Sequence, residues 1–215
     1  MNLASINYKT ILLTTLILGL ILPKWLLGFF SYNLSDNINL LINFDDAQYF
    51  PLIFNLSNFS FGESYIDYFD NAENFAVLLT PLLFHAIFYK FGGVVGIIII
   101  EVIYQLILIS LLFKVIQKIF GSYQISFLFC FVIFGLRIII QYLDSSYLTL
   151  LIGQIEGIFG SRVPRPIFSS IFLFLFFYQI LDFKKQLAIN FQYKYLLILS
   201  FSFGMLINSF LYYFL

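Results

Sequence analysis

The chain has very little of what polar chemistry in a soluble protein uses. Its 215 residues include one cysteine and one histidine, and Asp, Glu, Lys and Arg together make up only 10%. A single cysteine excludes an intrachain disulfide, and one cysteine with one histidine excludes a His/Cys metal cluster. The net charge is zero, which argues against a nucleic-acid partner, because the phosphate backbone is bound by basic surfaces. The sequence has neither a Walker loop nor a dinucleotide fingerprint.

Apolar residues are abundant instead. Hydrophobic residues make up 61% of the chain and aromatic residues 21%, and the mean hydropathy is +0.97. A soluble domain has roughly a quarter of its residues charged, so this chain needs lipid to cover its apolar surface. About 20 apolar residues cross a hydrocarbon layer of ~30 Å, and helices satisfy their own backbone hydrogen bonds there. The sequence therefore predicts an all-α, polytopic helical membrane protein.

Five apolar segments are long enough to be predicted as transmembrane helices. A further apolar segment, 74–91, is short and ends at Gly92-Gly93, a helix-stop signal. We predict that it is a juxtamembrane or re-entrant helix, and that 47–61 lies along the membrane surface. The prediction is one membrane domain over 1–215, with an outward loop at 31–92 and further spans in 93–215. The five predicted spans are 10–30, 93–113, 123–141, 167–181 and 195–215.

The positions of the lysines predict the orientation. Loops on the cytoplasmic side carry an excess of Lys and Arg. If 74–91 does not cross, all the loop lysines outside that segment lie on the cytoplasmic side, and the loops 31–92 and 142–166 face outward. If 74–91 does cross, these lysines are divided between the two sides, so a non-crossing segment is the preferred interpretation. The lysines concerned are Lys9, Lys114, Lys118, Lys184, Lys185 and Lys194.

The first outward loop is acidic, with no Lys or Arg between residues 31 and 73. Asp45 and Asp46 are adjacent in it, and such a pair can bind a divalent cation, or one member can take a proton from an attacking hydroxyl. The alternative is that both are simply solvated. Four further carboxylates, Glu63, Asp67, Asp70 and Glu73, are spaced three or four residues apart. On a helix they would lie on one solvent-exposed face. The carboxylates of the loop are Asp36, Asp45, Asp46, Glu63, Asp67, Asp70 and Glu73.

The second outward loop contains two arginines on either side of Pro164. Arg162 and Arg165 could hold a phosphate or pyrophosphate, since a guanidinium group offers a fork of hydrogen-bond donors. The alternative is that they anchor the start of the next span at the lipid headgroups. The sequence leaves these two interpretations open.

Polar residues inside the predicted spans form a third group of candidates. Glu101 lies near the middle of a span, and Arg137 lies at a similar depth in the next. Charged residues within a membrane usually face one another or a polar pathway, so we predict a structural Glu101–Arg137 pair. The alternative is a proton or ion pathway, and Gln105 lies one turn after Glu101. His85, four residues after Pro81, is predicted to be a packed histidine rather than a ligand.

The order of these features resembles a known family. The acidic motif is Asn43-Phe-Asp45-Asp46-Ala-Gln-Tyr49, and an apolar helix follows at Leu79-Thr-Pro81-Leu-Leu-Phe-His85 and closes at Lys90-Phe-Gly92. This resembles the N-terminal part of membrane glycosyltransferases of the GT-C superfamily, the mannosyl- and aminoarabinosyl-transferase type. The resemblance implies an active site at the acidic motif of the first outward loop, on the non-cytoplasmic face, and a sugar donor linked to polyprenyl phosphate.

The resemblance also implies roles for individual residues. Asp45 and Asp46 would be catalytic and would hold the divalent cation if there is one; no cofactor is certain. Arg162 and Arg165 would bind the phosphate of the donor, and Tyr49 and His85 are further substrate-binding candidates. The expected partners are the lipid bilayer, the lipid-linked sugar donor and a glycan, lipid or protein acceptor. The expected location is a bacterial inner membrane, with the active face outward.

The chain departs from the family in two respects. The family commonly has two prolines before its juxtamembrane helix, where this chain has Pro81 alone, and its members have about twice as many spans. Because the sequence is still apolar at Leu215, a truncated or split enzyme is one expectation. The alternative function is a non-enzymatic membrane transporter or assembly subunit, with Glu101 and Arg137 as its intramembrane polar pair. A polysaccharide polymerase or flippase is a third.

Overall fold

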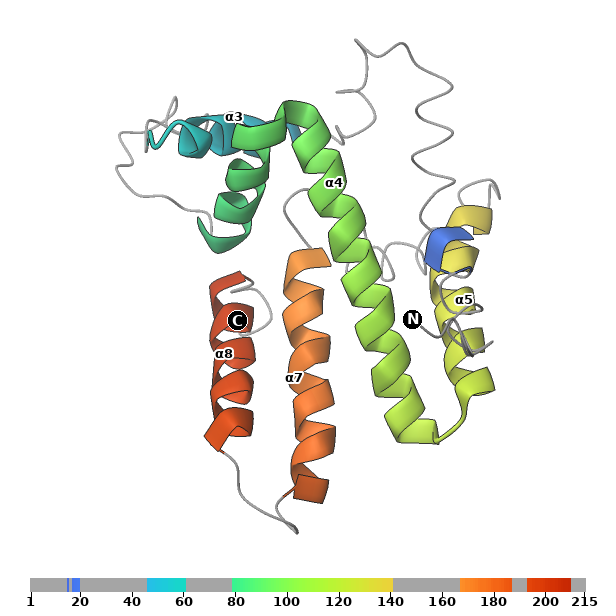
Figure 1. Cartoon of the computed structure of the whole chain (residues 1–215). Helices are drawn as coiled ribbons and strands as arrows, with labels where there is room; N and C mark the ends of the chain where they lie inside the picture. Colours follow the sequence, from blue (N-terminus) through green and yellow to red (C-terminus); the bar gives the residue numbers. More distant parts are fainter. Residues whose placement is uncertain are drawn as a thin grey trace, which may run out of the picture.

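The computed structural model describes residues 15, 17–19, 46–60, 79–140, 167–186 and 193–209. Within these ranges all the regular structure is helical and no strand occurs. The prediction of an all-α fold is confirmed for this part of the chain. The labelled helices in Figure 1 are α3 (Asp46–Ser57), α4 (Leu79–Phe120), α5 (Tyr123–Ile140), α7 (Ile167–Gln186) and α8 (Tyr193–Ser209).

The longest helix, α4, is sharply bent. Its backbone leaves helical geometry at Gly93, which has φ 56° and ψ −139°. A positive φ is strained for residues with a Cβ, so a glycine suits this position. In Figure 1 the green helix climbs to the top of the view and then turns downward. We call residues 79–92 the first arm of α4 and residues 94–120 its second arm. The bend lies where the sequence predicted a helix to stop.

The backbones of the two arms touch close to the bend. A Cβ atom added to Gly96 would lie 2.1 Å from the carbonyl oxygen of Phe88 and 2.7 Å from its carbonyl carbon. Two heavy atoms that are not bonded to each other cannot approach so closely. Glycine at position 96 is therefore what allows the second arm to pass against the first.

The remaining long helices lie beside the second arm in a single layer. Helix α7 contacts both α4 and α8, and α5 contacts α4 on the other side, giving the order α8, α7, α4, α5 across Figure 1. Their main core is apolar and includes Leu108, Ile109 and Leu112 of α4, Cys130 and Phe134 of α5, and Ile167, Phe168 and Ile171 of α7. Close packing of these side chains holds the layer together.

Helix α3 packs across the bend of α4. Its residues Leu52, Ile53 and Leu56 are buried in one cluster with residues from both arms of α4. We call Leu82 and Ala86 of the first arm and Ile97 of the second arm the α3 seat. The end of α3 is tied to the first arm as well, since Lys90 Nζ lies 3.9 Å from the centroid of the Phe59 ring, and Phe54 meets Tyr89 edge to face.

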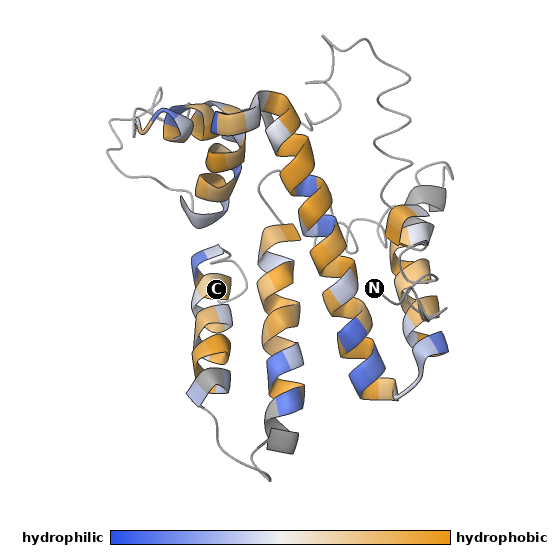
Figure 2. Ribbon diagram, in the orientation of Figure 1, coloured by the Kyte–Doolittle hydropathy of each residue, from blue (hydrophilic) through white to orange (hydrophobic). Residues whose placement is uncertain are grey.

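Most residues along these helices are hydrophobic (Figure 2). In the described residues, one helix, Thr80–Phe120, is long and apolar enough to cross a membrane by length and composition, and the bend divides it. Three shorter apolar helices accompany it: Tyr123–Gly135, Ile167–Asp182 and Tyr195–Ser209. This is a weak indication of membrane association, and the five-span arrangement stays a prediction. Large exposed apolar side chains include Phe91, Val95, Leu128, Phe129, Leu197 and Phe201.

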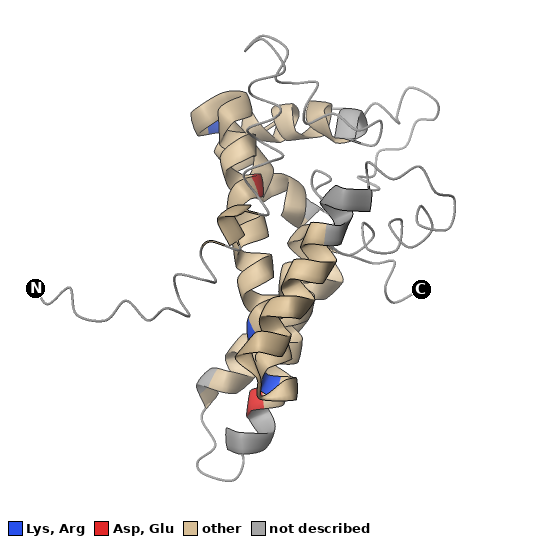
Figure 3. Cartoon of the chain, turned by 90° about the vertical axis from the view of Figure 1, so that its right-hand side faces the viewer, with Lys and Arg blue, Asp and Glu red and all other residues tan. Residues whose placement is uncertain are grey.

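Charged side chains are few, and several lie at one end of the layer (Figure 3). Lys118, near the end of α4, forms an ion pair with Asp182 of α7 at 2.5 Å. The ammonium group of Lys118 also lies over the ring of Tyr178. These contacts bring the C-terminal ends of α4 and α7 together.

The buried thiol of Cys130 provides a test of this packing. Its exposed fraction is 0% and it lies in the core between α5 and α4. We expect a small maleimide to leave Cys130 unmodified in the folded protein and to modify it after denaturation, because a thiol must reach water and ionise to react. Mass spectrometry of the detergent-solubilised chain measures this. Full modification before unfolding would contradict the packing of α5 on α4.

Candidate functional site

Of the acidic pair, the structure describes only the backbone of Asp46. Asp46 is the first residue of α3, while Asp45 lies outside the described residues, as does the side chain of Asp46. A carboxylate at this position also stabilises a helix, since it can cap the free N–H groups and complement the helix dipole. Because α3 packs into the bend of α4, the backbone at Asp46 is fixed relative to that bend.

The other predicted substrate-binding residues are only partly described. Tyr49 is half-buried, one turn into α3, and packs against the α3–α4 cluster. Arg162 and Arg165 lie outside the described residues. Arg137 belongs to α5, but its side chain is not described, so the predicted Glu101–Arg137 pair is not tested and stays a prediction.

The structure pairs Glu101 with His85. His85 Nε2 lies 2.9 Å from Glu101 Oε1, and the side chains are 0% and 2% exposed. His85 is on the first arm and Glu101 on the second, and each lies eight residues from Gly93. Equal spacing about a bend places two residues at equal distances from it, ~12 Å along each arm. The bend therefore brings the two side chains face to face.

The hydrogen bonds of His85 limit where its protons can lie. His85 Nδ1 is 2.8 Å from the carbonyl oxygen of Pro81, and a carbonyl oxygen can only accept, so Nδ1 carries a hydrogen. One proton then joins Nε2 and Oε1, either on an imidazolium that faces a carboxylate or on a neutral carboxyl that faces a neutral imidazole. The net charge of the pair is zero in both arrangements. A second proton on Glu101 Oε2 would be a buried donor with no described acceptor, which is costly.

Aromatic rings and further polar groups surround the pair. The ring of Tyr104 meets His85 edge to face, with centroids 5.5 Å apart, and Phe168 of α7 also meets Tyr104 edge to face. Glu101 Oε2 and Tyr104 Oη are both buried and find no hydrogen-bond partner among the described residues. Gln105, one turn after Glu101, is buried too. The first turns of the second arm thus carry a polar cluster inside an apolar layer.

The sequence analysis identified Glu101 and His85 separately but did not bring them together. The signal that could have done so is their equal spacing from the Gly92-Gly93 stop. If a helix turns back at a stop signal, polar residues at matched distances on either side become candidates for a pair.

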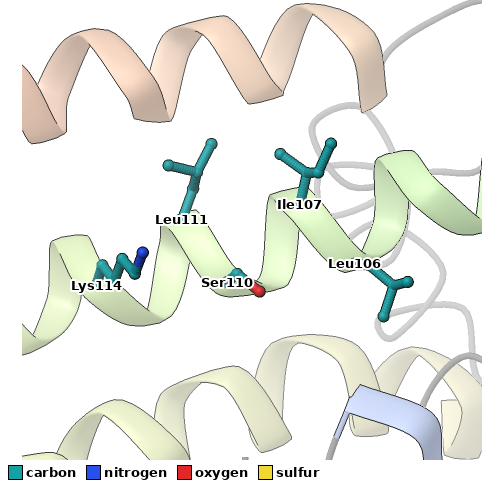
Figure 4. A pocket seen from close by; sticks show the side chains of 5 residues that line it. All are labelled: Leu106, Ile107, Ser110, Leu111 and Lys114. Atoms are coloured by element: carbon teal, nitrogen blue, oxygen red, sulfur yellow. The ribbon is translucent and has the colours of Figure 1, made fainter. Parts of the chain in front are cut away.

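A shallow groove lies along the second arm of α4. It encloses about 290 Å³ and is lined by Leu106, Ile107, Ser110, Leu111 and Lys114 (Figure 4). All five come from one helix, and none of them is a predicted site residue. In the part of the chain that the structure describes, no group of three or more His, Cys, Asp or Glu side chains could hold a metal ion. Whether Asp45 and Asp46 bind a divalent cation is not tested by this.

Comparison of the chain with protein-family models, curated proteins and solved structures finds no match.

Proposed function

We propose that this chain is a multi-pass membrane glycosyltransferase of GT-C type, which transfers a sugar from a polyprenyl-phosphate donor to an acceptor on the non-cytoplasmic face. The observation that carries the proposal is the position of α3. The helix begins at Asp46 and packs across the bend of α4, so the backbone of Asp46 is attached to α4 through this helix. An attached carboxylate can be held in position for catalysis, as acid–base chemistry requires.

The shape of α4 supports the predicted crossings. The first arm is ~20 Å long at 1.5 Å per residue, which is short of the ~30 Å hydrocarbon thickness. Its turn at Gly93 supports a re-entrant first arm followed by a second arm that crosses. The ion pair between Lys118 and Asp182 supports a topology in which the C-terminal ends of α4 and α7 lie on the same side of the membrane. That side would be the cytoplasmic one, where the lysines of the loops gather.

The reaction follows from the residues of the outward loops. The oxygen of the acceptor hydroxyl attacks the anomeric carbon, and Asp45 or Asp46 takes the hydroxyl proton. The bond between the anomeric carbon and the phosphate oxygen breaks, and polyprenyl phosphate leaves with the electron pair. Arg162 and Arg165 neutralise the charge of this phosphate. Attack from the face opposite the leaving group inverts the anomeric configuration, as the superfamily generally does.

A membrane-topology measurement tests the proposal without requiring the substrate. In a chain with Cys130→Ala, cysteines are placed beside the acidic pair as Asn43→Cys or Gln48→Cys, which leaves both acids intact. We expect a membrane-impermeant maleimide to label these positions from the non-cytoplasmic side of intact membranes. Lys185→Cys is the matched control, and we expect its labelling only after the membrane is opened. Labelling of position 43 only from the cytoplasmic side would refute the proposal.

The buried His85–Glu101 pair favours a second candidate function, a transporter or an assembly subunit. An ionisable pair inside a membrane layer is often part of a proton or ion pathway, and the free Glu101 Oε2 and Tyr104 Oη are polar groups that such a pathway could use. In that case the carboxylate itself is essential, and Glu101→Gln abolishes function while Asp45 and Asp46 are dispensable.

A further inference from the structure

We propose that the hydrogen bond between His85 and Glu101 positions the acidic pair, by fixing the two arms of α4 and with them the seat on which α3 lies. The inference rests on the proposed glycosyltransferase function for its catalytic meaning. The structural part of it concerns α3 and α4 alone. His85 and Glu101 are positioning residues in this proposal and do not touch the substrate.

The contacts form a short chain from the buried pair to α3. Ala86 follows His85 directly on the first arm, and Ile97 lies one turn before Glu101 on the second. Both residues belong to the α3 seat and share one buried cluster with Ile53. A change in the angle between the arms separates Ala86 from Ile97, so α3 loses part of its apolar contact. Asp46 is the first residue of α3 and moves with that helix.

The hydrogen bond between His85 and Glu101 is directional, whereas the apolar contacts between the arms are not. Apolar packing is roughly proportional to area and tolerates sliding, whereas a hydrogen bond weakens steeply away from its preferred geometry. The contact of Gly96 with Phe88 limits how closely the arms approach near the bend. The His85–Glu101 bond, farther from the bend, sets their separation there. In surroundings of low dielectric constant such a bond is stronger than in water.

The variant Glu101→Gln distinguishes the role of the hydrogen bond from the role of the ionisable carboxyl group. With Nδ1 bound to Pro81, a neutral His85 presents a lone pair at Nε2, and the amide N–H of glutamine can donate to it. Glu101→Gln therefore keeps the link between the arms but removes the ionisable carboxyl. The double variant His85→Leu/Glu101→Leu removes the link and leaves no unpaired polar group at either position. Replacing both partners of a buried pair by apolar residues can be nearly neutral for stability, so this variant is expected to fold.

The distance between α3 and the second arm tests the structural part. The full chain with Cys130→Ala carries spin labels at Asn58→Cys, just after α3, and at Val95→Cys, both exposed positions. Pulsed electron resonance in lipid nanodiscs then gives the distribution of distances. We expect one narrow distribution for the parent and for Glu101→Gln, and a broader or shifted one for the double leucine variant. Gln105→Leu, a buried polar residue outside the link, is the matched control and should resemble the parent.

Activity tests the catalytic part, with transfer from a polyprenyl-phosphate sugar in the same nanodiscs. We expect Glu101→Gln to keep the parent rate within about threefold, while the double leucine variant loses about 100-fold in kcat, as a displacement of ~1 Å can cause. An unchanged distance distribution in the double leucine variant overturns the inference. Loss of transfer in Glu101→Gln at unchanged distances also overturns it, and supports the transporter candidate. If the parent itself shows no transfer, the proposed function fails, while the distances still decide whether the pair positions α3.

Discussion

Replacing Asp45 or Asp46 with asparagine is expected to lower the rate of sugar transfer by about 100-fold or more. General base catalysis contributes 10²–10⁴-fold in typical enzymes, and an amide cannot take the proton of the acceptor hydroxyl. The change is nearly isosteric. Since asparagine also caps helices well, α3 should keep its start at position 46. We therefore expect insertion into the membrane and the packing of α3 on α4 to remain intact.

The measurement is transfer of a labelled sugar from polyprenyl phosphate by membranes that contain equal amounts of each variant. Asp70→Asn is the matched control, since it removes one carboxylate from the same acidic loop without touching the pair, and we expect nearly full activity from it. If both pair variants remain as active as this control, the assignment of the site to Asp45 and Asp46 is wrong.

Replacing Gly96 with alanine is expected to destabilise the protein by about 3 kcal/mol or more. The new Cβ would lie 2.1 Å from a backbone carbonyl oxygen of the first arm, and a backbone atom cannot move away as the end of a side chain can. Overpacking of a tight contact typically costs 1–3 kcal/mol, and occasionally more. The two arms must spread, and the α3 seat, which both arms form, spreads with them.

Gly92→Ala is the matched control for this prediction. Gly92 lies in the same helix, its φ is ordinary, and an added Cβ would meet nothing within 4 Å. Because alanine is the better helix former by about 0.5–1 kcal/mol, this variant should be as stable as the parent or slightly more so. Unfolding curves of both variants in the same detergent supply the comparison. Equal midpoints for Gly96→Ala and Gly92→Ala would contradict the close approach of the arms.

The apolar segments of the sequence match the helices of the layer well. The lysines are a poor guide to where α4 ends. The expected segment 123–141 corresponds to α5 (Tyr123–Ile140), and 167–181 begins where α7 begins. The predicted span 93–113 stops before Lys114, whereas α4 continues to Phe120. Lysine is a good helix former and does not stop a helix. The helix ends instead before Gly121, whose φ is 68°, which is a common way for helices to terminate.

The candidate site could be predicted only in part, because its two halves depend on different information. The acidic pair stands out in the sequence by composition alone, since it lies in a long loop without basic residues. The partner of Glu101 depends on the direction in which the chain returns after Gly93, which composition does not contain. We expected Arg137 because it is at the right depth on the next helix. The bend of α4 offers His85 from the same helix at the same depth.

The pairing of His85 with Pro81 and Glu101 has a consequence for the electrical behaviour of the protein. With Nδ1 bound to a carbonyl oxygen and a single proton between Nε2 and Oε1, the unit carries no net charge whichever residue holds that proton. A transmembrane voltage does work of ~2.3 kcal/mol per elementary charge per 100 mV, and so does almost none on this unit as a whole. The pair itself therefore adds no voltage dependence, and any voltage dependence of α4 comes from its lysines, Lys90, Lys114 and Lys118.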